Sequence, residues 1–142
     1  MAGILLDTNI ISELMRSRPE QVVMDWFASR THELFYISAI TQAEIQLGIS
    51  LLPAGKRRQM LADAAAEMFT QDFAGRCLPF DASCTPYYAA IVSARRRSGH
   101  GTSTEDALIA AIAVAHGYPL ATRNTKDFLH IDGLTLHNPW HA

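Results

Sequence analysis

The chain has 142 residues, the length of one domain, so we expect a single domain over residues 1–142. Hydrophobic residues make up 49% and charged residues 18%, a balance that excludes a disordered chain. The formal net charge of −2 at pH 7 excludes a surface that is basic overall. A nucleic-acid site would therefore have to be a local patch of positive charge.

Cysteine usage and hydropathy predict a reduced, cytoplasmic setting. The two cysteines, Cys77 and Cys84, form no CxxC pair, and we expect both to be packing residues. No apolar segment approaches the ~20 residues that a membrane span requires. Asp7 interrupts the first apolar run directly after Leu6. We therefore expect no membrane association.

The first half of the chain alternates short apolar runs with helical patterns. Residues 3–7 predict a buried strand, followed by a short helix through Ile11 and Leu14. Pro19-Glu20 predicts the start of a second helix, whose apolar residues are Val23, Trp26 and Phe27. Residues 34–38 predict the second strand, and residues 39–51 the third helix.

The second half repeats this alternation. Pro53-Ala54-Gly55 separates the third helix from a fourth one, predicted over residues 56–73. A third strand is expected at residues 77–80, and a fifth helix ends near residues 99–101. Residues 102–104 cap a strongly apolar sixth helix over 105–116, which Gly117 terminates. The last strands are expected at residues 119–122 and 134–137.

Strands that alternate with helices predict an α/β fold with right-handed crossovers between parallel strands. We expect a three-layer α/β/α sandwich around a central parallel sheet of four to five strands. Ligands of such sheets bind beyond the carboxyl ends of the strands. The residues at that edge are therefore the first candidates for a functional site.

Three acidic residues are expected at this edge, although they are far apart in the sequence. Asp7 ends the first strand, Glu44 lies in the second turn of the third helix, and Asp106 lies in the first turn of the sixth. Helical spacing places Glu44 on an apolar stripe expected to face the core, formed by Ile40, Leu47 and Leu51. Asp106 lies on a second stripe that continues to Ala113.

Neither helical acid has a Lys or Arg at helical spacing, and an inward carboxylate without a positive partner is unfavourable. A shared Mg²⁺ ion would compensate all three acids, because it accepts carboxylate oxygens together with water. Two structural alternatives stay open at this stage. Asp7, followed by Thr8-Asn9, is also a suitable helix cap, and Asp106 also suits a helix dipole.

Four short blocks resemble the motifs of the PIN-domain family, and within it the VapC-like and FitB-like toxins. Leu5-Leu6-Asp7-Thr8-Asn9 resembles the first motif, and Ser38 to Ile45 with Gly48 resembles the second. Glu105 to Ala111 resembles the third motif, and Leu120 to Asn124 followed by Asp127-Phe128 resembles the fourth. The blocks occur in family order from residue 5 to residue 128. Each is short, and only the four together are specific.

The resemblance implies a magnesium-dependent endoribonuclease, with Mn²⁺ as a substitute ion. Asp7, Glu44 and Asp106 would be the metal ligands and catalytic residues. Asn124 stands where family members often carry an acid, and Asp127 is three residues further on. Either would complete the site, and Asn124 cannot neutralise a second cation.

The resemblance also implies partners. The protein would be the toxin of a toxin–antitoxin pair, would act on RNA as a homodimer, and would meet DNA only through its antitoxin. Two adjacent aromatic pairs support a partner surface, because one helical stripe buries only one member of a pair. These pairs are Trp26-Phe27 and Tyr87-Tyr88. The alternative is that both members of each pair reach the core.

Other functional classes are less compatible with the sequence. It contains no GxxxxGKS, GxSxG or HExxH motif. The basic triplets at residues 56–58 and 95–97 are either solvated helix faces or contacts to an RNA backbone. The alternative from a different class is a non-catalytic PIN-fold module that binds protein or nucleic acid.

Overall fold

The computed structural model describes residues 2–141 and contains a five-stranded sheet in the order β3-β2-β1-β4-β5. Each pair of neighbouring strands is parallel, so the predicted α/β class and parallel sheet are confirmed. β1 lies at the centre of the sheet and pairs with β2 and β4. The strands are β1 (Ala2–Leu6), β2 (Glu33–Ser38), β3 (Cys77–Leu78), β4 (Leu120–Ala121) and β5 (Leu136–His137).

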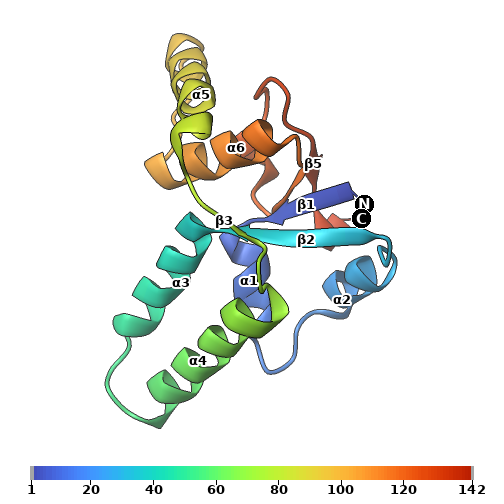
Figure 1. The fold of residues 1–142 in the computed structure, drawn as a ribbon, viewed down its shortest axis with the longest axis vertical. Coiled ribbons are helices and arrows are strands. Elements are labelled where there is room, and N and C mark those ends of the chain that lie inside the picture. Colours follow the sequence, from blue (N-terminus) through green and yellow to red (C-terminus); the bar gives the residue numbers. More distant parts are fainter. Residues whose placement is uncertain (1, 142) are drawn as a thin grey trace.

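Helices cover both faces of the sheet, as Figure 1 shows. One face carries α1 (Thr8–Leu14), α2 (Gln21–Ala28), α3 (Ala39–Ser50) and α4 (Lys56–Glu67). The other face carries α5 (Thr85–Arg97) and α6 (Thr104–His116). Alternate residues of β1 point to the two faces: Ile4 and Leu6 join the core beneath α1 and α2, and Leu5 joins the core beneath α6. The predicted three-layer sandwich is thus present.

Local capping determines where the helices that carry acids begin. The Ser38 hydroxyl accepts a hydrogen bond from the Thr41 N–H at 3.0 Å and caps α3. The Ser103 hydroxyl accepts one from the Asp106 N–H at 3.1 Å and caps α6. Gly117, with a φ of 69°, ends α6 in the left-handed conformation that glycine adopts without strain.

Several predicted boundaries need correction. α2 begins at Gln21, after Pro19-Glu20, because the backbone of Glu20 is extended, with a ψ of 135°, and its N–H donates to the Glu13 carboxylate. The predicted helix over residues 56–73 ends at Glu67 and continues as a π-helical turn, Met68–Asp72. Two phenylalanines at this turn, Phe69 and Phe73, are buried in the core. The last three strands are shorter than predicted.

The predicted buried stripe of α3 is wrong. Leu47 and Leu51 are 60% and 76% exposed, whereas Thr41 and Ile45 are buried. α3 contacts α1, α4 and α6, and these neighbours cover its Thr41 and Ile45 side. The inward face of this helix is therefore partly polar, which hydrophobicity alone does not reveal.

The aromatic pairs differ from each other. Trp26 is buried, and Phe27 packs edge-on against it with ring centroids 5.0 Å apart and also contacts Phe35 at 4.8 Å. Both members of this pair therefore belong to the core, and the expectation of a second surface for one of them is wrong. Tyr88 packs against Phe80, while Tyr87 is 41% exposed.

One arginine of the basic triplet at residues 95–97 has a structural role. Arg95 is buried and donates hydrogen bonds to the carbonyl groups of Leu129 and Gly101, so α5 is not a uniformly solvated basic face. Cys84 is buried and Cys77 half-buried, and both are free thiols. Within residues 2–141, the structure contains no helix with the length and apolar character of a membrane span.

Candidate active site

The three predicted acids line one cavity at the carboxyl edge of the sheet. The cavity has a volume of about 580 Å³, and Asp7, Glu44 and Asp106 all contribute to its wall. Asn124 lines it too, whereas Asp127 does not. The sequence therefore predicted which acids meet. The remaining lining residues are Thr8, Asn9, Ser12, Glu13, Arg16, Arg123 and Trp140.

Two short hydrogen bonds hold Asp7, which is 5% exposed, and the Asn9 amide donates a longer one to its Oδ2 at 3.5 Å. Its Oδ1 accepts from the Thr8 N–H at 2.8 Å, so it does cap α1, and its Oδ2 accepts from the Thr122 hydroxyl at 2.8 Å. Burial raises the pKa of Asp7 to about 6 although both hydrogen bonds lower it, and the charges of Asp106 and Glu44 raise it further. Helix capping and a place in the cavity are thus compatible roles.

Glu44 is positioned by a threonine from another element. The Thr8 hydroxyl donates to Glu44 Oε1 at 2.7 Å and lies 3.0 Å from the hydroxyl of Thr41, which is fully buried. These contacts connect the start of α1 to the first turns of α3. Glu44 itself is half-buried, at the boundary between the polar side of α3 and the cavity.

Asp106 enters the cavity from the first turn of α6. Burial raises the pKa of its carboxyl, hydrogen bonding between the Ser103 side chain and the carboxyl lowers it, and the neighbouring charges of Asp127 and Glu44 raise it further. Asp127 is therefore an electrostatic neighbour of Asp106 although it does not line the cavity. Asn124 lines it, and its backbone N–H donates to the Thr122 hydroxyl at 3.1 Å.

The donor set fits a hard divalent cation. Among residues 2–141, Asp7, Glu44 and Asp106 form no ion pair with Lys, Arg or His. Within the same residues, no three His, Cys, Asp or Glu side chains converge closely enough to enclose an ion by themselves. Carboxylates spread around a wide cavity match Mg²⁺, which binds one or two carboxylates and keeps several waters.

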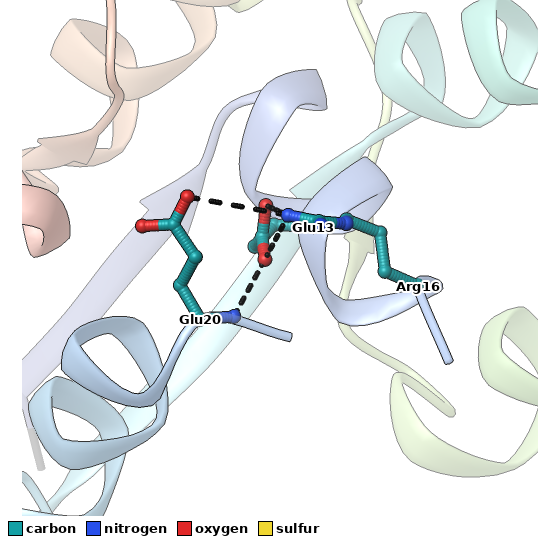
Figure 2. A network of polar contacts seen from close by, with 3 residues as sticks. All are labelled: Glu13, Arg16 and Glu20. Carbon is teal, nitrogen blue, oxygen red and sulfur yellow. Dashed lines mark hydrogen bonds and ion pairs between the residues drawn. The ribbon is translucent and has the colours of Figure 1, made fainter. Parts of the chain in front are cut away.

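Glu13 is a buried acid of the cavity that the sequence did not reveal. Its carboxylate oxygens accept two bonds from Arg16 Nη1 at 3.1 Å and one from the Glu20 N–H at 2.7 Å. Figure 2 shows Arg16 beside Glu13, with Glu20 on the other side of Glu13. Arg16 Nη1 lies 4.0 Å from Glu20 Oε1. These bonds hold the pKa of Glu13 below its ordinary value. The spacing of Glu13 and Arg16 indicated a pair, but not its burial.

Arg123 and Trp140 contact each other in the lining of the cavity. The Arg123 guanidinium carbon lies 4.8 Å from the centroid of the Trp140 ring, which is 9% exposed. The backbone N–H of Arg123 donates to Asn9 Oδ1 at 3.2 Å, which connects Arg123 to α1. No sequence signal joined these residues, because Trp140 comes from a 3-10 turn at Pro139–His141.

Comparison with known proteins identifies the family. The PIN domain family matches residues 4–134. The chain belongs to the PIN-domain family. Among relatives of this PIN domain, plasmid stability protein StbB from Pseudomonas syringae pv. tomato is 45% identical, with 98% of this chain and 99% of StbB covered. VapC ribonuclease Y4jK from Sinorhizobium fredii is 42% identical, with 96% of this chain and 97% of Y4jK covered.

Solved structures place the PIN domain within the VapC and FitB group. The structure of FitAB bound to the IR36 DNA fragment matches with a TM-score of 0.89 and 42% identity, over 98% of this chain and 96% of that one. Solved relatives of this PIN domain are toxin–antitoxin complexes, and some contain DNA. The predicted family and fold are therefore confirmed, and ribonucleases of this family are typically metal-dependent.

Proposed function

We propose that this PIN domain is a magnesium-dependent endoribonuclease and the toxin of a toxin–antitoxin pair. The observation that carries the proposal is the meeting of three carboxylates without ion pairs in one open cavity at the carboxyl edge of the sheet. A structural role alone does not explain three such acids, because each is unfavourable without a compensating charge. The similarity to VapC ribonuclease Y4jK supports the same activity.

Asp7, Glu44 and Asp106 would hold the Mg²⁺ ion, and Mn²⁺ would substitute for it. When bound, such an ion supplies an activated water and stabilises charge on the phosphate. The chain's own task is to orient the three carboxylates. The Thr8 N–H and the Thr122 hydroxyl fix the two oxygens of Asp7, and the Thr8 hydroxyl fixes Oε1 of Glu44. Each of these carboxylate oxygens has a further lone pair for an ion.

Asn124 and Asp127 would have supporting roles. We assign to Asn124 the positioning of water or RNA through its amide, because it lines the cavity. Asp127 would act through Asp106, whose ionisation it opposes until a cation arrives. An uncharged amide at position 124 favours one metal ion over two.

The test is cleavage of a short single-stranded RNA with Mg²⁺, with Mn²⁺, and with a chelator. We expect cleavage with either ion and none with chelator, and Asp106→Asn should abolish it. Asp63→Asn is the matched control, because Asp63 is an exposed acid on α4. Cleavage that persists in chelator or in Asp106→Asn would contradict the proposal. Tight RNA binding without cleavage would favour the non-catalytic binding module.

A second cavity supports an antitoxin partner. This groove, of about 800 Å³, lies between α1, α3 and α4 and shares Thr8, Ser12, Arg16 and Glu44 with the active-site cavity. Its far part is apolar and is lined by Met15, Ile45, Ile49, Leu52, Met60 and Leu61. A segment of the antitoxin would fill this groove and reach the acids, and DNA would be bound by the antitoxin. Purified toxin mixed with the product of the neighbouring gene should form a complex that no longer cleaves RNA.

The expected homodimer has a candidate surface on the outer side of α3. Leu47 and Leu51 are exposed there, and exposed apolar residues in a cluster indicate contact with another molecule. Light scattering should give the mass of a dimer, and Leu47→Asp with Leu51→Asp should give a monomer. A monomeric wild-type protein at micromolar concentration would contradict this assignment.

A further inference from the structure

We propose that Arg123, assisted by Arg16, forms a subsite for an RNA phosphate adjacent to the scissile one. The inference rests on the proposed ribonuclease function and specifies how that cavity holds its substrate. The lining of the cavity combines two kinds of charge: carboxylates, which repel phosphate, and two arginines, which attract it. RNA can enter such a cavity only if positive side chains offset the repulsion by the acids.

Arg123 has the features of a binding residue that is ready for an anion. Within residues 2–141 its guanidinium forms no ion pair and no side-chain hydrogen bond, and its nearest acidic influence is Glu13, which is already bonded to Arg16. Its planar group lies over the Trp140 ring, which restricts its motion before RNA arrives. A guanidinium that is held in place and retains its hydrogen-bond donors can bind a phosphate with two parallel bonds.

Arg123 is also fixed relative to the acids. It follows Thr122, whose hydroxyl donates to Asp7. The backbone N–H of Arg123 donates to Asn9 Oδ1. Asn9 in turn donates to the Thr122 hydroxyl at 3.3 Å. Through this network, the backbone that carries the arginine is connected to the Asp7 carboxylate. A phosphate on Arg123 would therefore place the neighbouring phosphate reproducibly near Asp7.

Arg16 is held by an ion pair with Glu13 instead of by an aromatic ring. Within residues 2–141 its side-chain hydrogen bonds all come from Nη1 and go to Glu13, and its side chain is 56% exposed. Its Nε and Nη2 donors thus remain for a ligand. Because Glu13 and Glu20 offset its charge, Arg16 should contribute less to phosphate binding than Arg123.

The test compares Arg123→Met with Arg18→Met, which removes an exposed arginine between α1 and α2 that does not line the cavity. Methionine retains an apolar stem against Trp140. We expect Arg123→Met to raise KM for single-stranded RNA by about 10- to 100-fold, with a smaller change in kcat. In an Asp106→Asn background, the slope of log Kd against log salt should become shallower by about 0.7, the value of one phosphate contact.

Two further comparisons test whether Arg123 itself binds the adjacent phosphate. Arg123→Lys, which keeps the charge and lacks the planar fork, should lie between wild type and Arg123→Met. Replacing the phosphate next to the cleavage site with a neutral methylphosphonate should weaken wild type but not weaken Arg123→Met further. Independent, additive losses would overturn the subsite. So would unchanged KM and salt slope in a variant that melts like wild type.

The wild-type protein reports on the proposed function in the same assay. If wild type cleaves RNA with Mg²⁺ and Arg123→Met behaves like Arg18→Met, the subsite is wrong and the ribonuclease assignment stands. If wild type neither cleaves nor binds RNA, both fall.

Discussion

Asp7 and Glu13 are two buried acids, six positions apart, and their pKa values are shifted in opposite directions. Each is 5% exposed, and both line the same cavity. Glu13 lies under Arg16 and accepts the Glu20 N–H, so its ionised form is favoured. Asp7 has only neutral hydrogen-bond donors and faces two further acids, so its ionised form is opposed. Burial by itself therefore does not identify a functional acid.

The difference lies in what compensates the charge. The charge of Glu13 is satisfied within the chain, and the residue orders the segment between α1 and α2. The charge of Asp7 lacks a positive partner within residues 2–141, which leaves it for a ligand. Groups whose ionised state is unfavourable until a ligand binds are common at active sites.

Catalysis should separate the two acids most strongly. Asp7→Asn should lower kcat for RNA cleavage by about 100- to 1000-fold or more, because it removes a charge that acts on the reacting groups. Glu13→Gln should change kcat far less, since Glu13 holds Arg16 and the segment before α2 and its charge is already compensated within the chain. Single-turnover cleavage at saturating Mg²⁺ measures both. Similar losses in the two variants would abolish the distinction.

Stability without metal should change in opposite directions. The pKa of Asp7 in the folded chain, about 6, lies above its ordinary 3.8, so ionised Asp7 destabilises the fold above pH 6 and has no such effect below pH 4. Asp7→Asn should therefore raise the free energy of unfolding in chelator at pH 8 by up to about 3 kcal/mol, and by little at pH 4. Glu13→Gln should lower it at pH 8, because the lowered pKa of Glu13 stabilises the fold above its ordinary range. Denaturant titrations at both pH values test the signs.

Magnesium should remove the unfavourable contribution of Asp7. At roughly 100 times its Kd, a ligand specific for the folded state adds about 2.7 kcal/mol, so wild type should melt at a higher temperature with Mg²⁺. The gain should disappear in Asp7→Asn and should weaken in wild type as the pH falls below 6, where Asp7 gains a proton. Glu13→Gln should retain the gain. A gain of equal size in Asp7→Asn would show that the ion binds elsewhere.

The smallest effect is expected far from both acids. A Cβ on Gly3 would lie 2.8 Å from the Tyr118 ring and 2.9 Å from the Tyr36 ring, and these two rings are stacked on each other. Gly3→Ala should destabilise the fold by about 1–2 kcal/mol and leave kcat unchanged. Gly48→Ala, where no atom lies within 4 Å of the new Cβ, should instead stabilise α3 by about 0.5–1 kcal/mol. Thermal melts and cleavage assays on both variants provide the comparison.

Periodicity and capping residues predicted the order of the elements, the parallel sheet and the acids that meet. These features depend on local patterns, such as Ser103 before α6 and the apolar run before Asp7. The outward side of α3 was mispredicted, because Leu47 is apolar but the neighbouring helices cover Thr41 and Ile45 instead. The features that were missed depend on distant residues.

Arg123 on Trp140 is the clearest example of such a feature. Seventeen positions separate the two residues, and their contact exists only after β5 and the final 3-10 turn have packed against the cavity. The burial of Glu13 has the same origin, because it depends on how the segment leading to α2 folds back over α1. Pairings of this kind are set by tertiary packing and leave no periodic signal in the sequence.

The shortness of the outer strands restricts how another chain can join this fold. β3 and β5, at the two edges of the sheet, have two residues each. An added strand would find too few free backbone groups there to form a stable ladder, so both sheet extension by a partner peptide and edge-to-edge aggregation are disfavoured. A partner must instead recognise side chains, and the groove between α1, α3 and α4 presents them, with charged residues where it meets the active-site cavity and apolar residues in its far part.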